Sequence, residues 1–464
     1  MKSADVVVIG AGPGGYVAAI RAAQLGKSVI CIEREYVGGV CLNVGCIPSK
    51  AMINAGKVLH KVDTYAEMGI EMDGVSVDIN RLVDWKQKVV DRLTGGVSFL
   101  FKHHNVEHVV GEATFQSATT LSVDTPDGEI TVEGKDIIIA TGSRPIELGA
   151  FPVDGETVLG STECLAIDEI PKRVLVIGGG YIGLELGTFL RHLGVEVIVV
   201  EATDGLLPGQ DRELVKVVAR NLKKKKVQVL TDSFAQGFEK LDGGGVRVTV
   251  DSKKKGTITF DVDWVLSTVG RRPNSEDLGL EAIGVEIENG FVKIDEQCRT
   301  SVPNVYAIGD VAGQPMLAHK ASREGVVAAG AIAGQPTACD WRAVPAVIFT
   351  DPEIASVGLT EEQATAAGYE IKVGKFQFRA NGRALSLSEP DGFAKIVTDA
   401  SNDVVLGVHI VGAEATELIA EGGLAIEMGA RAEDIASTIH AHPTLPEVLA
   451  EAAEAVHGLQ IHAV

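Results

Sequence analysis

Val6-Val7-Val8-Ile9-Gly10-Ala11-Gly12-Pro13-Gly14-Gly15 decides the fold of this chain, because a short β-type run leads directly into a cluster of glycines. An alanine-rich helix is expected over 16–25, and a second strand over 28–32 leads to Glu33. The glycines permit a tight turn and let the backbone approach a pyrophosphate, while the acid accepts hydrogen bonds from a ribose. Together these features predict a dinucleotide-binding unit.

The same unit recurs further along the chain. Gly10, Gly12, Gly15 and Glu33 each match a residue 168 positions later, and these are Gly178, Gly180, Gly183 and Glu201. The matching elements are a strand over 174–177, a helix to about residue 193 and a strand over 196–200. The repeat predicts two dinucleotide sites in one chain, so that a hydride can pass from one cofactor to the other.

Glu201 bears on the choice of the second dinucleotide. A carboxylate at this position binds the 2′-hydroxyl of NAD and repels the 2′-phosphate of NADP. Arg191 and Lys223 are cations that could meet a phosphate, but neither lies at the end of the strand. The sequence therefore favours NAD.

Two cysteines follow the first unit, in Cys41-Leu42-Asn43-Val44-Gly45-Cys46, and lead into Ile47-Pro48-Ser49-Lys50. In a regular helix this spacing would separate the thiols by about 7.5 Å along the axis, whereas a disulfide needs Cα atoms within about 4.4–6.8 Å. If the thiols pair, the backbone must be irregular near Gly45, with a helix that begins near Cys46. Lys50 then lies one turn beyond Cys46, on the same face. The pair predicts a two-electron redox relay, and the alternative is two buried structural cysteines.

Bulk composition limits the class of protein. A chain of 464 residues is too long for one core, so three or four domains are expected. No apolar run reaches the about 18 residues of a membrane span, and the apolar start at residues 6–9 ends in glycines without a cleavage site. A net charge of −21 disfavours nucleic acid as the main partner. We expect a cytoplasmic chain.

The other cysteines and the lysine runs carry no functional signal. Cys31, Cys164, Cys298 and Cys339 lack partners at motif spacing, so ordinary buried or half-buried thiols are expected and no metal site is predicted. The lysine runs 223–226 and 253–255 are expected at the end of a helix and in a hairpin turn, as solvated faces.

Further motifs resemble those of the pyridine nucleotide–disulphide oxidoreductases, over essentially the whole chain. They are Gly38–Lys50, Ala140–Pro145, Thr268–Asn274, Val305–Asp310 and His440–Glu447. The resemblance implies an α/β fold with two Rossmann-like dinucleotide-binding domains and an α+β C-terminal dimerisation domain. It places an FAD domain at 1–147, an NAD domain at 148–272, a central segment completing the FAD domain at 273–343 and the interface domain at 344–464.

The resemblance also assigns residues to the two cofactors, FAD and NAD. The implied cofactor-binding set is Gly10, Gly12, Gly15, Glu33, Gly39, Lys50, Ala113, Thr141, Gly142, Asp310, Ala318, Gly178, Gly180, Gly183, Glu201 and Gly270. Within it, Asp310 would bind the ribityl or phosphate region of the flavin, Ala318 would contact the ring, and the backbone of Ala113 would contact the adenine. Glu185 would pair with Lys50; the alternative for Glu185 is a free carboxylate on a helix surface.

Catalytic roles follow from the same resemblance, which is strongest to members that oxidise dihydrolipoyl groups. His442, oriented by Glu447, would be the base that deprotonates the dithiol, and it would serve the other subunit of a homodimer. The substrate thiolate would attack Cys41 in a Cys41–Cys46 disulfide and release Cys46 as a stabilised thiolate. His440 is expected to be structural. The implied partners are lipoyl domains as substrate and the peripheral-subunit-binding domain of a dihydrolipoyl acyltransferase.

Other readings remain open. A glutathione-reductase-like enzyme shares the disulfide and flavin logic, but Ser49 stands where that enzyme has lysine. A mercuric reductase would carry paired C-terminal cysteines, which residues 457–464 lack, and a soluble transhydrogenase would not need both Cys41 and Cys46. A non-catalytic flavoprotein assembly subunit would not need His442.

Overall fold

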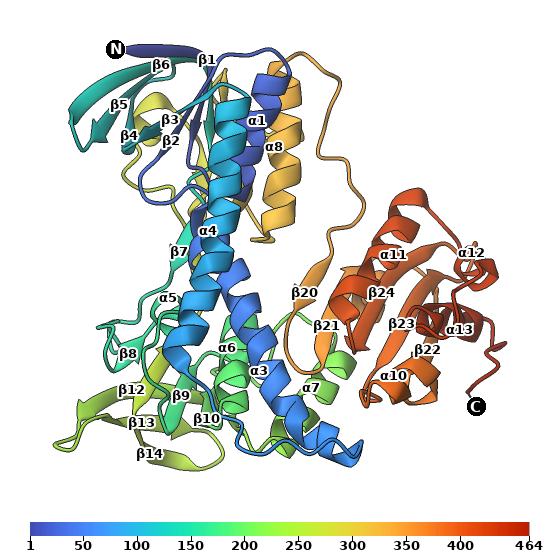
Figure 1. Cartoon of the computed structure of the whole chain (residues 1–464). Coiled ribbons are helices and arrows are strands. Elements are labelled where there is room, and N and C mark those ends of the chain that lie inside the picture. The colour runs from blue at the N-terminus through green and yellow to red at the C-terminus, as the bar shows by residue number, and fades with distance from the viewer. Residues whose placement is uncertain (464) are drawn as a thin grey trace.

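The computed structural model describes residues 1–463, which form three larger β-sheets with helices packed around them (Figure 1). The first sheet has seven strands in the order β3-β2-β1-β6-β5-β4, and β19 pairs with the end of β6 that extends beyond β5. Its strands are β1 (Lys2–Ile9), β2 (Val29–Glu33), β3 (Val106–Val110), β4 (Glu112–Ser117), β5 (Thr120–Thr125), β6 (Gly128–Ile139) and β19 (Val305–Ala307). The late strand β19 therefore rejoins the first sheet, as the sequence predicted.

The second sheet is parallel throughout and has the order β11-β10-β9-β15-β8. Its strands are β8 (Val158–Leu159), β9 (Arg173–Ile177), β10 (Glu196–Val200), β11 (Gln228–Leu230) and β15 (Trp264–Ser267). An antiparallel sheet of β12 (Ser233–Lys240), β13 (Val246–Ser252) and β14 (Gly256–Val262) lies next to it. The two chain crossings between the units, β7 (Ser143–Pro145) and β16 (Arg271–Pro273), pair with each other.

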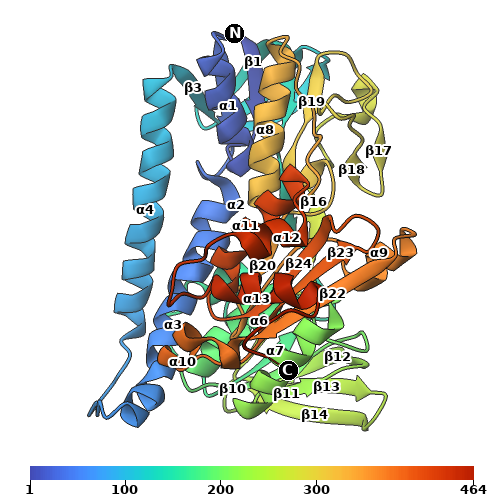
Figure 2. The same ribbon diagram turned by 90° about the vertical axis from the view of Figure 1, so that its right-hand side faces the viewer.

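The third sheet is antiparallel and belongs to the C-terminal unit, which Figure 2 shows from the side that carries α12 and α13. Its order is β20 (Ala346–Ile348), β21 (Glu353–Gly358), β24 (Val405–Gly412), β23 (Phe393–Asp399) and β22 (Ile371–Gln377). The helices of this unit are α9 (Glu361–Ala366), α10 (Gly382–Ser386), α11 (Ala415–Met428), α12 (Ala432–Ser437) and α13 (Glu447–Val456).

The remaining helices connect these units. They are α1 (Pro13–Gln24), α2 (Gly39–Asn43), α3 (Cys46–Glu67), α4 (Ile79–His103), α5 (Ser161–Cys164), α6 (Tyr181–His192), α7 (Arg212–Lys224) and α8 (Ala318–Ile332). Short elements complete the chain: β17 (Ile287–Glu288), β18 (Phe291–Val292) and 3₁₀ turns at Glu281–Ile283, Gly309–Val311 and Phe378–Ala380. Figure 1 shows α3 and α4 side by side, reaching from the first unit to the second.

The two glycine loops have the same backbone. Gly10 and Gly178 have φ values of +103° and +104°, a region that L side chains rarely adopt. A Cβ at Gly10 would lie 2.4 Å from the carbonyl oxygen of Ala140, and one at Gly178 would lie 2.6 Å from that of Thr268. Each first glycine is therefore required by the neighbouring strand end, and the sequence repeat is confirmed as a repeat of structure.

A buried cluster joins the three units around α3. Met52 of α3, Phe189 of α6 and Ile348 of β20 are all nearly inaccessible and belong to one hydrophobic core. The close approach of α3 to α6 requires Gly56, because a Cβ there would lie 3.2 Å from the ring of Phe189. Helix α3, which begins at the thiol pair, thereby fixes the position of the second unit relative to the first.

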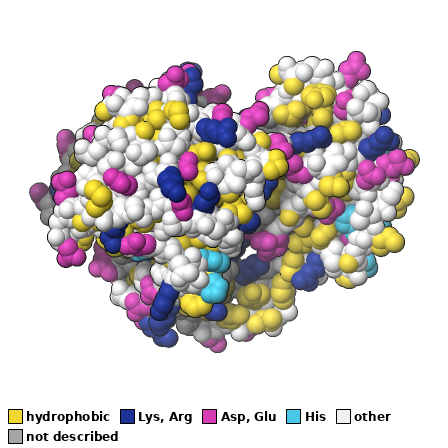
Figure 3. Space-filling model, turned by 90° about the horizontal axis from the view of Figure 1, so that it is seen from above, with side chains coloured by type: hydrophobic (Ala, Val, Ile, Leu, Met, Phe, Trp, Pro, Cys, Tyr) yellow, Lys and Arg dark blue, Asp and Glu magenta, His cyan; other side chains and the backbone are white. Residues whose placement is uncertain are grey.

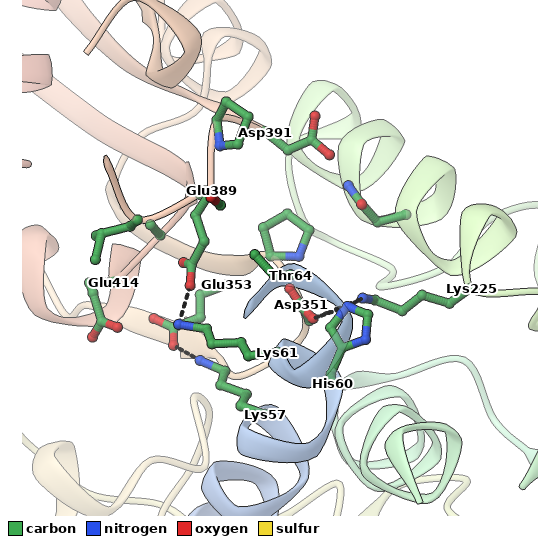
Figure 4. Close-up of a pocket in the computed structure, with 17 residues that line it drawn as sticks. Lys57, His60, Lys61, Thr64, Lys225, Asp351, Glu353, Glu389, Asp391 and Glu414 are labelled. Atoms are coloured by element: carbon green, nitrogen blue, oxygen red, sulfur yellow. Dashed lines mark hydrogen bonds and ion pairs between the residues drawn. The ribbon is translucent and has the colours of Figure 1, made fainter. Parts of the chain in front are cut away.

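A polar pocket lies where α3, α7 and the C-terminal unit meet (Figure 4). Lys57 pairs with Glu353 at 2.5 Å, and Lys225 pairs with Asp351 at 3.0 Å. The side chain of Lys225 is only 11% exposed, so the expectation of a solvated face is wrong for this lysine. Its own helix ends one residue earlier, which turns the side chain toward the C-terminal unit.

Among residues 1–463, no helix has both the length and the apolar character to cross a membrane.

Candidate active site

The thiol pair lies at a break between two helices. Helix α2 ends at Asn43 and α3 begins at Cys46, which confirms the predicted helix start. Gly45 between them has φ −138° and ψ −111°, and a Cβ there would lie 2.9 Å from the carbonyl oxygen of Val40. The restart brings the two thiols close enough to shift each other's pKa, which the axial spacing of an unbroken helix disfavours.

The two cysteines are free thiols in this structure and interact with each other. The hydrogen bond between them raises the pKa of Cys41 far above its usual range, and burial adds to the rise. The same hydrogen bond, with help from the positive charge of Lys50, lowers the pKa of Cys46 to about 7 against the opposing effect of burial. Cys46 is therefore the thiol that ionises first.

Lys50 is held by a buried carboxylate from the second unit. Its Nζ donates to Oε2 of Glu185 at 2.8 Å, so the expected ion pair is present, and the carboxylate side chain is only 4% exposed. Oε1 of Glu185 accepts a hydrogen bond from the backbone N–H of Phe349 at 2.8 Å. Nζ of Lys50 also lies 4.7 Å from the centre of the Phe349 ring, a cation–π distance. Phe349 is a site residue that no sequence motif indicated.

The second glycine of each nucleotide loop lies where a ligand can approach. A Cβ at Gly12 or at Gly180 would meet no protein atom within 4 Å, so packing within the chain does not explain these glycines. Both residues are extended and precede a helix, α1 or α6, whose first N–H groups suit a pyrophosphate. Gly39 packs directly against the first loop, because a Cβ there would lie 2.6 Å from Cα of Gly12.

The acids at the strand ends are placed identically in the two units. Glu33 accepts hydrogen bonds from the N–H groups of Ala11 at 2.7 Å and Glu35 at 2.9 Å. Glu201 accepts equivalent bonds from Gly179 at 2.6 Å and Thr203 at 2.7 Å, each 168 residues later. Both carboxylates therefore lie beside their glycine loops, as a ribose-binding acid must. The third glycines also match, since a Cβ at Gly15 or Gly183 would collide with the carbonyl of the first glycine of its loop.

A hydrogen-bonded chain surrounds Asp310, just beyond β19. Ser143 Oγ donates to Asp310 at 2.5 Å and accepts from Nε of Arg271 at 2.8 Å. Thr141 Oγ1 donates to the carbonyl of Asn274 at 2.6 Å, just outside the two crossing strands β7 and β16. Ser143, Arg271 and Asn274 belong to the motifs quoted above, but their sequence gave no sign of these contacts.

The remaining expected cofactor residues are dispersed around these loops. Ala318 is the first residue of α8, and Ala113 is buried in β4 opposite Val123 of β5. Gly142 and Gly270 have φ values of +69° and +121° at the two crossings between the units. These positions are compatible with the expected contacts, and their roles stay predictions.

A histidine–carboxylate pair lies in the C-terminal unit. Nδ1 of His442 lies 2.8 Å from Oε1 of Glu447, whose Oε2 accepts from the N–H of Thr444. Burial raises the pKa of Glu447, but these two hydrogen bonds outweigh it and leave the pKa below its usual value. The His442 side chain is 79% exposed, so its Nε2 is available to a substrate. His440 differs, because both of its ring nitrogens have partners in the chain, Thr438 and Glu421.

The two halves of the site are separated within one chain. Figure 1 places α12 and α13, which flank His442, at the far edge of the molecule from the start of α3. Seen from above, the C-terminal unit forms a lobe of its own with apolar side chains on its surface (Figure 3). Leu424, Met428 and Ile439 are exposed on this unit. The base and the thiols therefore belong to different surfaces of the chain.

Cys298 and Cys339 are buried and half-buried free thiols, as expected, but they also lie next to each other, which the sequence did not indicate. Their sulfurs lie 3.5 Å apart although the residues are 41 positions apart in the chain. Sequence spacing could not reveal this pair, because a loop and a linker from different parts of the chain bring it together. Cys31 and Cys164 are fully buried and without a thiol partner within residues 1–463, as expected.

Two family models match the chain. The model of the pyridine nucleotide-disulphide oxidoreductases matches residues 4–325, and the model of their dimerisation domain matches residues 344–453. The second match supports a homodimer.

The chain is also similar to individual proteins over nearly its whole length. It is 53% identical to the dihydrolipoyl dehydrogenase of Bacillus subtilis (strain 168) over 463 residues, which are 99% of this chain and 98% of the relative. It is 51% identical to the dihydrolipoyl dehydrogenase of Geobacillus stearothermophilus over 460 residues, 99% of this chain and 97% of the relative. The crystal structure of LpdA from Mycobacterium tuberculosis superposes with a TM-score of 0.90 at 26% identity, covering 98% of this chain and 99% of LpdA.

Replacing Cys41 by alanine should raise the pKa of Cys46, because the Cys41 thiol is the partner that lowers it most. With a pKa of about 7, Cys46 of the reduced wild-type protein is roughly half thiolate at neutral pH. Its rate of alkylation by iodoacetamide, followed on the Cys46 peptide by mass spectrometry, should rise with a midpoint near pH 7. In Cys41→Ala the midpoint should move upward and the rate at pH 7 should fall. Cys41→Ser keeps a hydroxyl that can donate a hydrogen bond, so the midpoint should move less than in Cys41→Ala. Identical pH profiles in the wild type and both variants would contradict the conclusion that Cys41 lowers the pKa of Cys46.

Proposed function

Because the chain belongs to the pyridine nucleotide-disulphide oxidoreductases, we propose that it oxidises protein-bound dihydrolipoyl groups to lipoyl groups with reduction of NAD⁺. One observation carries the proposal. Lys50, one turn beyond Cys46, is joined to Glu185, which lies two residues after Gly183 of the second nucleotide loop. The thiols are thus tied to both nucleotide loops at once, as a relay from a dithiol to a nicotinamide requires.

The family implies FAD and NAD, and the two glycine loops fit them. When bound, these cofactors supply the two-electron transfer that side chains cannot. We assign FAD to residues 1–147 with 273–343, where β19 rejoins the first sheet, and NAD to 148–272. Residues 344–464 form the interface unit. Glu33 and Glu201 would face the two riboses, and the carboxylate of Glu201 favours NAD over NADP.

The side chains of the site account for the movement of protons and thiols. Glu447 holds His442 through Nδ1, so that Nε2 removes a proton from the dihydrolipoyl dithiol. The resulting thiolate attacks the sulfur of Cys41 in the Cys41–Cys46 disulfide, and a mixed disulfide forms as Cys46 leaves. The second substrate thiol then displaces Cys41, which gives the lipoyl disulfide and two reduced cysteines. Cys46 leaves readily because the positive charge of Lys50 stabilises its thiolate.

The base is expected to act on the thiols of the other subunit. The dimerisation domain supports a homodimer, and exposed apolar residues lie on the same unit as His442. Its exposed Nε2 and the distance between α13 and α3 in one chain favour a site built from two chains (Figure 1). A monomer would then lack a complete site.

Activity with dihydrolipoamide should separate this function from the alternatives. The protein loaded with FAD should form NADH from dihydrolipoamide and NAD⁺, and its kcat/KM with NADP⁺ should be lower by more than about tenfold, since a carboxylate faces the extra phosphate. Absorbance at the NADH band measures both. Glutathione as the reductant is the control. Preference for glutathione with NADP⁺ would instead identify a glutathione-reductase-like enzyme, and no turnover with either would favour a non-catalytic flavoprotein.

Mixed dimers should test the shared site. Homodimers with Cys41→Ser or with His442→Gln should each be nearly inactive. After subunit exchange between them, about half of the dimers should be hybrids in which one site combines intact Cys41 with intact His442. Activity should then return to about a quarter of the wild-type value. If mass spectrometry confirms exchange and no activity returns, His442 does not serve the partner's thiols.

The homodimer should also dock on the peripheral-subunit-binding domain of a dihydrolipoyl acyltransferase, whose lipoyl domains present the substrate. The net charge of −21 would steer a basic domain toward it. The affinity, measured by titration calorimetry, should fall several-fold as salt rises from about 0.05 to 0.5 M, because added ions screen the attraction. An affinity that does not change with salt would exclude electrostatic docking.

A further inference from the structure

Cys298 and Cys339 form a second close thiol pair, separate from the thiols assigned to catalysis. Cys298 follows β18 in the turn that leads toward β19, and Cys339 lies in the linker between α8 and β20. Their sulfurs are 3.5 Å apart. A disulfide needs about 2.0 Å, so the sulfurs must approach by about 1.5 Å, which small rotations about the side-chain bonds can provide. We propose that this pair is a second redox-active dithiol, which low-molecular-mass disulfides oxidise to a Cys298–Cys339 cross-link.

The loop that carries Cys298 is a fixed turn. Oδ1 of Asp295 accepts hydrogen bonds from the N–H groups of Gln297 at 2.8 Å and Arg299 at 2.9 Å, and the N–H of Cys298 donates to the carbonyl of Asp295. Cys298 itself has φ +62°, a conformation that few side chains adopt. The turn thereby directs a fully buried sulfur toward the linker.

The linker is fastened to this turn by two hydrogen bonds next to the sulfur contact. The N–H of Cys339 donates to the carbonyl of Glu296 at 2.6 Å. Nε2 of Gln297 donates to the carbonyl of Thr337 at 3.1 Å. Two hydrogen bonds that involve consecutive residues of the turn, Glu296 and Gln297, therefore hold the linker in place. The thiols stay opposite each other without a covalent bond.

The two thiols differ in the way that an attacking and a resolving thiol must differ. Cys339 is partly exposed, whereas Cys298 is buried. The hydrogen bond from Cys298 lowers the pKa of Cys339. Burial and the carboxylate of Glu324 oppose this effect, and the charges of Lys320 and Arg323 assist it. The same contact and burial raise the pKa of Cys298 far above its usual range. Cys339 is accordingly the thiolate that a reagent meets first.

The exchange balances in two steps. The thiolate of Cys339 attacks one sulfur of a disulfide RS–SR, which forms a mixed disulfide at Cys339 and releases RS⁻. Cys298 then attacks the Cys339 sulfur, the Cys298–Cys339 bond forms, and the second RS⁻ leaves. The two protons of the cysteine thiols end on the two released thiolates. Overall the cysteine pair is oxidised by two electrons and the reagent is reduced to two thiols.

Glutathione disulfide provides the test on the FAD-loaded dimer. The protein is reduced, freed of reductant, exposed to glutathione disulfide, and then alkylated under denaturing conditions before trypsin digestion. Oxidation should join the peptides Ile294–Arg299 and Glu324–Arg342, which Lys293, Arg299, Arg323 and Arg342 delimit. Cys31 and Cys164 are the matched internal controls, because both are buried without a thiol partner and should remain alkylated. The proposal is wrong if glutathione disulfide fully oxidises Cys41 and Cys46 but leaves Cys298 and Cys339 reduced, so that both are recovered as alkylated cysteines.

Single variants determine the order of attack. Cys298→Ser should retain glutathione on Cys339, because the resolving thiol is gone. Cys339→Ser should take up glutathione on Cys298 more than about tenfold more slowly. Cys298 is fully buried, which hides its sulfur from the reagent and raises its pKa even without the Cys339 thiol. Glutathione on both cysteines of the wild type without a cross-link would overturn the proposal. The oxidised wild type should also melt at a higher temperature than oxidised Cys298→Ser, since a cross-link restricts the unfolded chain, and dithiothreitol should remove the difference.

Discussion

The buried carboxylate of Glu185 is the constraint on which the arrangement of the site depends. A carboxylate that is only 4% exposed has lost its hydration and must recover that free energy from partners in the protein. The partners come from the other two units: the ammonium of Lys50 from α3 and the backbone N–H of Phe349 beyond β20. If α3 moved away the buried charge would lose its counter-ion, and if the C-terminal unit moved away the carboxylate would lose a hydrogen bond. One ion pair therefore locates the thiol-bearing helix, the second nucleotide loop and the C-terminal unit with respect to each other.

Helix α3 carries this constraint through the molecule. Its start is set by the backbone break at Gly45, which also sets the thiols, and its next turns present Lys50 and Met52 to the second unit. Further along, the missing side chain of Gly56 lets the helix approach Phe189. At the next residue, Lys57 pairs with Glu353 of the C-terminal sheet. Helix α3 thus carries the thiol pair, the apolar packing between the units and the ion pairs between the units.

Local sequence patterns made the fold predictable, together with the part of the site that the two glycine loops and their acids form. The glycine loops and their acids depend on backbone geometry within about 25 residues, so the repeat could be found and its copies matched residue by residue. The helix and strand ends were less accurate: α1 begins at Pro13 rather than residue 16, and β1 begins at Lys2, since pairing with β6 extends the strand beyond its apolar part. Phe349 and the Cys298–Cys339 contact escaped detection, because both depend on where distant segments pack and neither leaves a periodic or motif signal.

The two thiol pairs of this chain resemble each other in their sulfur contacts and differ in what surrounds them. Both have one thiol of lowered and one of raised pKa, since a hydrogen bond between sulfurs always favours ionisation of the acceptor. Only Cys46 also has a lysine held one turn away by a buried acid, next to a loop that leaves room for a dinucleotide. Sulfur proximity permits exchange with any accessible disulfide, whereas electron transfer onward requires the neighbouring loops. The environment of the pair, rather than the pair itself, carries the function.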